Sequence, residues 1–181
     1  PLAAQAPNGP APADPSARLR EVLPPDVAAR VLAVIADARA HGLADAALAQ
    51  RALKFAARGI PAADIERSVA EQARRQARVQ TLLASSRGAA PAGDEIEAGA
   101  EAMREGLDGR DVSALAKTAP SGRSLTIPLY VLGSLTSHGL ASDQALSRVQ
   151  QRLAAGASDA DLEALPQDAA AHAGDGAAPG E

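Results

Sequence analysis

The sequence predicts an all-α protein, built as a stack of helices joined by tight corners. Apolar residues recur at helical spacing through most of the 181-residue chain, and no run alternates in the manner of a half-buried strand. Alanine, the strongest helix former, is abundant, whereas Phe55 and Tyr130 are the only aromatic residues. Burial must therefore rest on Leu, Val, Ile and Ala, and alanine allows helices to approach closely.

Composition divides the chain into five segments. Residues 1–15 and 166–181 are rich in Pro, Ala and Gly and are expected to be an extended N-terminal tether and an acidic C-terminal tail. Residues 86–93 have the composition of a linker. This linker separates a first helical unit, residues 16–85, from a second, residues 94–165.

The first unit is predicted to hold a short helix and then three helices separated by two corners. Ser16 is the expected cap of the short helix, residues 17–23. Gly42 and Gly59 are expected to end the next two helices, because a left-handed stop favours a residue without a Cβ. Pro61 suits the first turn of the third helix, where its missing N–H has no partner to lose.

This third helix is expected to be the longest in the chain and to have two different faces. Its apolar face is interrupted by amides, which suits a contact between helices or subunits better than a dry core. The interrupting residues are Gln72, Gln76 and Gln80.

The second unit is predicted to contain five helices, each opened by a side chain that can cap it. Its first helix, residues 95–105, is acidic. The expected caps are Asp94, Asp108 or Asp111, Ser124, Ser142 and Ser158.

The corners of the two units share a sequence pattern. The stretch His41-Gly42-Leu43-Ala44 recurs 97 residues later as His138-Gly139-Leu140-Ala141, and Gly59 recurs as Gly156 at the same offset. Each corner is a helix stop, a short span and a new start. The pattern predicts an internal repeat and a right-angled or solenoid-like stack rather than a straight bundle.

The chain resembles a group of exported, Ala-rich, uncharacterised helical proteins of high-GC bacteria. The stretches that carry the resemblance are GLADAALAQRALKFAARGIPAADI and GRSLTIPLYVLGSLTSHGLASDQAL, within about residues 26–165. The resemblance implies no activity and no functional residue. Because some of these bacteria are phototrophic, it suggests an extrinsic subunit of a membrane complex such as a photosynthetic reaction centre.

The first residues suggest export. Ala4-Gln5-Ala6 fits the small-x-small pattern of a signal-peptidase site, the alternative being the Pro/Ala-rich leader of a cytosolic protein. No apolar run is long enough to span a membrane. Without cysteine, disulfides and thiolate chemistry are excluded. We therefore expect an extracytoplasmic, periplasmic protein, peripheral to a membrane complex.

No catalytic, metal or cofactor site is predicted. The chain has neither a nucleophile elbow nor a phosphate loop. His41 and His138 each precede a glycine at a helix end and are interpreted as helix-capping residues. The stretch 120–124 could hold an anion at a helix start, but a capped turn is the commoner meaning. The alternative, an enzyme or small-ligand carrier, would use His138 and Arg123.

Charge is distributed unevenly: the net charge is −4, with +4 in residues 1–90 and −8 in residues 91–181. Two surfaces are predicted to bind another protein. One is an arginine stripe on the long helix, where Arg74 and Arg78 lie within about 20° of Arg67, with Arg75 beside them; the other is the acidic face formed by Glu97, Glu101 and Glu105.

The sequence thus predicts a non-enzymatic helical scaffold or accessory subunit that binds a larger protein assembly. Tails of the kind expected at both ends often become ordered on a partner. Nucleic acid is not an expected partner, because the chain is acidic overall and nearly free of aromatic residues.

Overall fold

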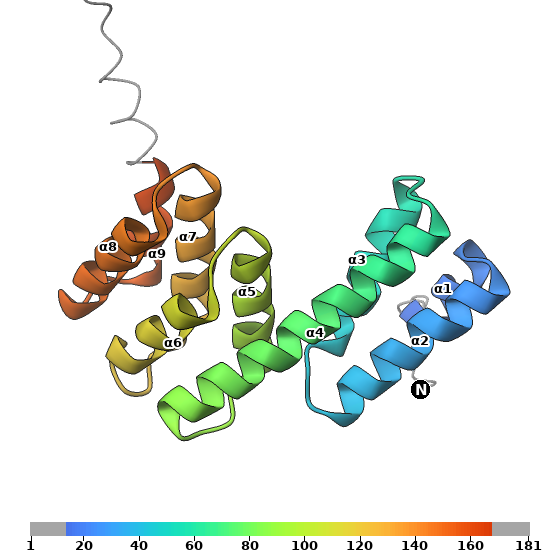
Figure 1. Ribbon diagram of the computed structural model, residues 1–181, viewed down its shortest axis with the longest axis horizontal. Helices are drawn as coiled ribbons and strands as arrows, with labels where there is room; N and C mark the ends of the chain where they lie inside the picture. The colour runs from blue at the N-terminus through green and yellow to red at the C-terminus, as the bar shows by residue number, and fades with distance from the viewer. Residues whose placement is uncertain (1–13, 168–181) are drawn as a thin grey trace, which may run out of the picture.

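The computed structural model describes residues 14–167, which form nine helices and no strand, and so confirms the all-α class (Figure 1). The helices are α1 (Pro15–Val22), α2 (Pro25–Ala40), α3 (Asp45–Ala57), α4 (Ala62–Arg87), α5 (Gly93–Arg104), α6 (Gly109–Thr118), α7 (Thr126–Ser137), α8 (Ser142–Ala154) and α9 (Asp159–Glu163). The first thirteen residues, with Ala4-Gln5-Ala6, and nearly all of the predicted C-terminal tail lie outside the described residues.

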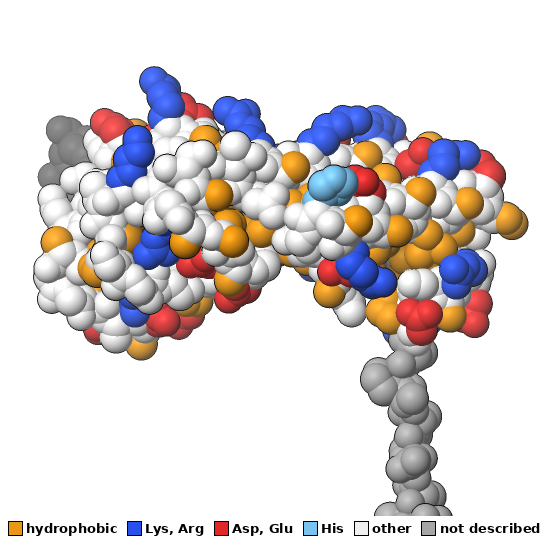
Figure 2. Space-filling model, turned by 90° about the horizontal axis from the view of Figure 1, so that it is seen from below, with side chains coloured by type: hydrophobic (Ala, Val, Ile, Leu, Met, Phe, Trp, Pro, Cys, Tyr) orange, Lys and Arg blue, Asp and Glu red, His pale blue; other side chains and the backbone are white. Residues whose placement is uncertain are grey.

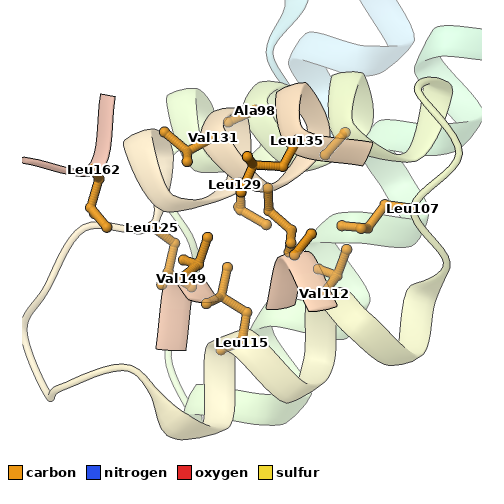
Figure 3. Packing of buried hydrophobic residues seen from close by; sticks show 14 of the residues in the cluster. Ala98, Leu107, Val112, Leu115, Leu125, Leu129, Val131, Leu135, Val149 and Leu162 are labelled. Carbon is orange, nitrogen blue, oxygen red and sulfur yellow. The ribbon is translucent and has the colours of Figure 1, made fainter. Parts of the chain in front are cut away.

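Two hydrophobic cores share the long helix α4. In the N-terminal lobe, α1, α2 and α3 pack against the first half of α4 around Leu48 and Ile65. In the C-terminal lobe, α5–α9 pack against its second half around Leu83 and Leu129. Leu115, Leu125 and Val149 of the C-terminal core converge in Figure 3. The two lobes meet at a narrower waist (Figure 2).

The cores divide within α4 and not at the linker predicted for residues 86–93. Val69 belongs to the N-terminal core, whereas Val79 and Leu83 belong to the C-terminal core. The linker does end the helix, with Gly88 at φ 68°. However, α4 has 26 residues and spans about 39 Å, so its second half extends past α2 and α3 and packs against α5 and α6.

The predicted glycine corners are present. After each of five helices a glycine has positive φ, and the N–H of the next residue donates to a carbonyl five positions earlier, at 2.9–3.1 Å. These glycines are Gly42, Gly59, Gly106, Gly139 and Gly156. The internal repeat is not confirmed: after the matching second corners, α4 has 26 residues and α9 has five.

Helix starts were predicted less accurately. Asp108 and Ser158 cap α6 and α9 as expected. The other expected caps differ from the structure as follows: Asp14 rather than Ser16 caps α1, α5 begins after Ala92 rather than after Asp94, Leu125 rather than Ser124 occupies the cap position of α7, and Ser142 is the first residue of α8 after Ala141. Several polar residues stand near each start, and spacing alone does not choose among them.

Two glycines bring the helices of the C-terminal lobe close together. A Cβ built on Gly99 of α5 would lie 2.5 Å from Cγ1 of Val79 on α4, and one on Gly133 of α7 would lie 2.9 Å from Cα of Ala102 on α5. Because of these close approaches, α5 sits tightly between α4 and α7. Among residues 14–167, no helix combines the length and the apolar character needed to cross a membrane.

Candidate functional site

A groove of about 840 Å³ opens between the two lobes, on the side of α4 where α3 and α5 lie (Figure 1). We call it the interlobe groove. Helix α3 forms one wall, and α5 and α7 form the other. Both aromatic side chains of the chain lie in it, from helices far apart in the sequence. The lining residues are Ala47, Gln50, Arg51, Lys54, Phe55, Arg58, Glu97, Glu101, Arg104 and Tyr130.

The α3 wall is basic. Arg51, Lys54, Phe55 and Arg58 share one helical face, because they are three, four and seven positions apart. The Arg51 guanidinium lies 4.9 Å from the centre of the Phe55 ring, within cation–π range. Lys54 and Arg58 are exposed and form no ion pair within residues 14–167. The rim of this wall therefore carries two positive charges without a counter-ion among the described residues.

Beneath the groove, two glutamines of α4 are completely buried and hold the carboxylates of α5. Gln72 Nε2 donates to Glu101 Oε1 at 2.9 Å, and Gln76 Nε2 donates to Glu97 Oε2 at 2.5 Å. Arg75 in turn donates to Gln72 Oε1 at 2.8 and 3.0 Å. The amides thus fix the orientation of both carboxyl groups.

The two carboxylates of the groove differ in their counter-ions. Glu101 accepts from Arg51 Nη1 at 3.0 Å and from Arg104 Nε at 2.6 Å. Glu97, in contrast, has no ion pair in the described part of the chain, and only the amides of Gln72 and Gln76 donate to it.

Burial raises the pKa of Glu97 and of Tyr130 above their usual values. For Glu97 the charge of Glu101 adds to this effect, while the hydrogen bonds from Gln76 and Gln72 and the charge of Arg51 oppose it. For Tyr130 the negative charges of Glu97 and Glu101 add to it. The groove therefore contains a carboxylate whose charge is only partly compensated, with a neutral phenol nearby.

The structure places the predicted acidic face in the groove. Glu97 and Glu101 line it, and Glu105 accepts from Arg104 Nη2 at 3.0 Å. Glu97 and Glu101 therefore lie in a concave, partly neutralised site rather than on an open acidic surface, and Glu105 lies outside it.

The predicted arginine stripe lies elsewhere. Arg67, Arg74 and Arg78 are exposed on the face of α4 opposite Gln76, and Arg67 pairs with Asp64. Arg75 instead donates a hydrogen bond to Gln72, which lies at the waist. The structure thus separates the two surfaces that the sequence predicted.

Six charged or aromatic residues of the groove were not predicted from the sequence: Arg51, Lys54, Phe55, Arg58, Arg104 and Tyr130. The spacing of the first four on one helical face was a usable signal. Nothing in the local sequence indicates that Tyr130 and Phe55 line the same groove, because the packing of distant helices places them there.

His41 and His138 occupy the C-cap positions of α2 and α7, which confirms the capping interpretation. His41 Nδ1 donates to the carbonyl of Asp37 at 2.8 Å, and His138 Nδ1 donates to that of Ser134 at 2.7 Å. Arg123 pairs with Asp159 and precedes α7, whereas His138 follows it. A helix of this length separates the two by about 18 Å, so they form no joint site.

Other hollows lie outside the groove, and two of them are of comparable volume. One, of about 630 Å³, lies between α2 and α4 and is lined mainly by apolar residues such as Val34 and Ala73. Figure 2 shows exposed apolar side chains on this lobe. The other, of about 590 Å³, surrounds the α4–α5 turn, where Glu95 binds Arg87 at 3.4 Å.

Comparison with protein families, curated protein sequences and solved structures finds no match to this chain, so its site is interpreted from its own geometry.

Proposed function

We propose that the protein is a non-enzymatic accessory subunit that binds a segment of another protein in the interlobe groove. The observation that carries the proposal is the gathering of Phe55 and Tyr130, the only two aromatic side chains of the chain, in one exposed concave site. Tyr130 is 43 % exposed. Aromatic and arginine side chains dominate the binding energy of protein interfaces, and here Arg51 stacks on Phe55.

Charge favours a polypeptide over a nucleic acid. A nucleic acid carries a negative charge on every residue and would meet Glu97 and Glu101 in the groove. A polypeptide can place acidic side chains opposite Lys54 and Arg58 while its other side chains enter the groove. We therefore expect acidic residues in the part of the partner that faces α3.

The expected setting of the complex is outside the cytoplasm, beside a membrane assembly such as a photosynthetic reaction centre. This setting rests on the Ala4-Gln5-Ala6 pattern and on the resemblance to exported proteins. The proposed location and the proposed binding site do not depend on each other, because the groove would bind a polypeptide in any compartment.

Site-specific photo-crosslinking in the cells that produce the protein tests the proposal. A photoreactive amino acid replaces Gln50, which lines the groove, or Gln144, which is exposed on α8. We expect one protein to crosslink from position 50 and not from position 144. Combining the probe with Lys54→Glu and Arg58→Glu should greatly reduce the product.

Two results would contradict this function. The first is an equal product from both positions, because the contact would then not be specific to the groove. The second is a product that nuclease removes, because the groove would then bind nucleic acid.

A further inference from the structure

We propose that Glu97 is the acceptor for a cationic side chain, lysine or arginine, of the segment bound in the interlobe groove. This inference rests on the proposed function and specifies the chemistry of the partner at one point. The partner would therefore carry acidic residues toward α3 and one basic side chain that enters the groove toward α5.

The contrast between neighbouring carboxylates on α5 supports this assignment. Glu101 is satisfied within the chain, because Arg51 and Arg104 both donate to it, at 3.0 and 2.6 Å. Glu97 lies one turn away and lines the same groove, but no cation of the described residues pairs with it. A partly buried carboxylate is stabilised by a paired cation. Because Glu97 has no such cation among the described residues, a ligand can supply it.

The position of Glu97 is fixed in advance of binding. Gln76 Nε2 donates to Oε2 at 2.5 Å and Gln72 Nε2 contacts Oε1 at 3.4 Å, both from the buried side of the carboxyl group. Gln76 is completely buried, and its Nε2 also donates to the carbonyl of Ala44 on the α3 side of the waist at 3.3 Å. A carboxylate held in this way binds an incoming cation without first losing rotamer freedom.

The surroundings favour an organic cation over a metal ion. Glu101 is already engaged by two arginines, so a metal ion would find only one free carboxylate, and within residues 14–167 no cluster of three metal-ligating side chains occurs. Tyr130 lines the groove near Glu97 and is affected by its charge. An aromatic face beside a carboxylate suits the guanidinium group of arginine or the ammonium group of lysine.

Titration of the purified protein with two small probes tests this inference. The probes are N-acetyl-arginine amide and its uncharged isostere, N-acetyl-citrulline amide. Because the chain has one tyrosine and one phenylalanine, the ring signals of Tyr130 and Phe55 in NMR spectra report on the groove without ambiguity. Glutamate carboxyl signals report on Glu97 itself.

We expect the arginine probe to shift the Tyr130 ring and the Glu97 carboxyl signals saturably, and the citrulline probe not to do so. Glu97→Gln should weaken arginine binding roughly tenfold or more, since a charge-assisted hydrogen bond is lost. Glu71→Gln is the matched control: it removes the same charge from an exposed position outside the groove and should leave binding unchanged.

Three results would overturn the inference. They are equal shifts from both probes, no saturable shift with the arginine probe, or unchanged binding of the arginine probe to the Glu97→Gln variant. Unchanged Phe55 ring signals in the free variant would show that the variant is folded. The crosslinking result is independent: a protein captured from position 50 with no arginine effect removes only the cation site. Arginine binding without a captured protein removes the proposed function and leaves the cation site.

Discussion

Replacing Glu97 by glutamine should stabilise the protein near neutral pH, although it removes a partly buried, hydrogen-bonded charge. Glutamine has nearly the same shape as glutamate and carries no charge to desolvate. It also brings an N–H next to Gln76, whose buried Oε1 lacks a donor in the described structure. An unsatisfied buried acceptor costs about 1–3 kcal/mol. Since the charge-assisted bond from Gln76 Nε2 becomes a neutral one, we expect a net gain of about 1 kcal/mol.

The gain should depend on pH in a definite direction. The pKa of Glu97 is raised from 4.5 in the folded protein, chiefly by burial, so between 4.5 and the folded value the folded state binds more protons than the unfolded chain. The stabilising contribution of Glu97 is therefore complete below pH 4.5 and is lost as pH rises through its folded pKa. The groups facing Glu97 are Gln72 and Gln76 from α4, Arg51 from α3, Tyr130 from α7 and Glu101 on its own helix.

Urea denaturation followed by circular dichroism, at several pH values from about 4 to 8, measures this effect. Other carboxylates titrate in the same range, so the useful quantity is the free energy of unfolding of Glu97→Gln minus that of the wild type. We expect it to be near zero at the acidic end and about 1 kcal/mol at neutral pH, a rise in Tm of about 2–4 °C. Glu71→Gln should give a flat difference. A variant less stable than the wild type at neutral pH would refute the reasoning.

Three further changes test the packing and the surfaces. Gly133→Ala should lower the free energy of unfolding by about 1 kcal/mol, because a Cβ 2.9 Å from Cα of Ala102 costs more than the gain in helix propensity. Urea denaturation measures this change, and a stabilised variant would contradict it. Glu95→Ala should lower the free energy of unfolding by about 2 kcal/mol, because the buried Leu125 N–H, which donates to Glu95 at 2.8 Å, would lack an acceptor. A loss below about 0.5 kcal/mol in the same assay would argue against this role of Glu95. Arg74→Glu tests the arginine stripe: reduced crosslinking from position 50 with an unchanged Tm would bring this surface into the interface, and an unchanged product would exclude it.

The corners could be predicted from the sequence because their requirement is local. Positive φ at Gly42 and Gly139 follows from the need for a residue without a Cβ at a left-handed stop. The apolar face of α4 could also be predicted, since Ile65 and Leu83 fall at helical spacing and both are buried.

The candidate site could be predicted only in part. Glu97 and Glu101 were recognised as an acidic face, but the neutralisation of Glu101 depends on Arg51, a residue of another helix. The placement of Phe55 and Tyr130 in one groove depends on the packing of α5 between α4 and α7. Such contacts are set by tertiary structure, and the period of a single helix carries no information about them.

The amides at the waist are explained by the groove rather than by the fold. Along the buried face of α4, Gln72 and Gln76 stand at the same spacing as Val69 and Val79, between the last residues of one core and the first of the other. Leucine at both positions would join the two cores into one and would bury more apolar surface. It would also remove every amide donor to Glu97, leaving a partly buried carboxylate with neither hydrogen bonds nor a counter-ion. The glutamines therefore orient Glu97 and oppose the rise of its pKa, which favours a ligand in the groove more than it favours the folded chain alone.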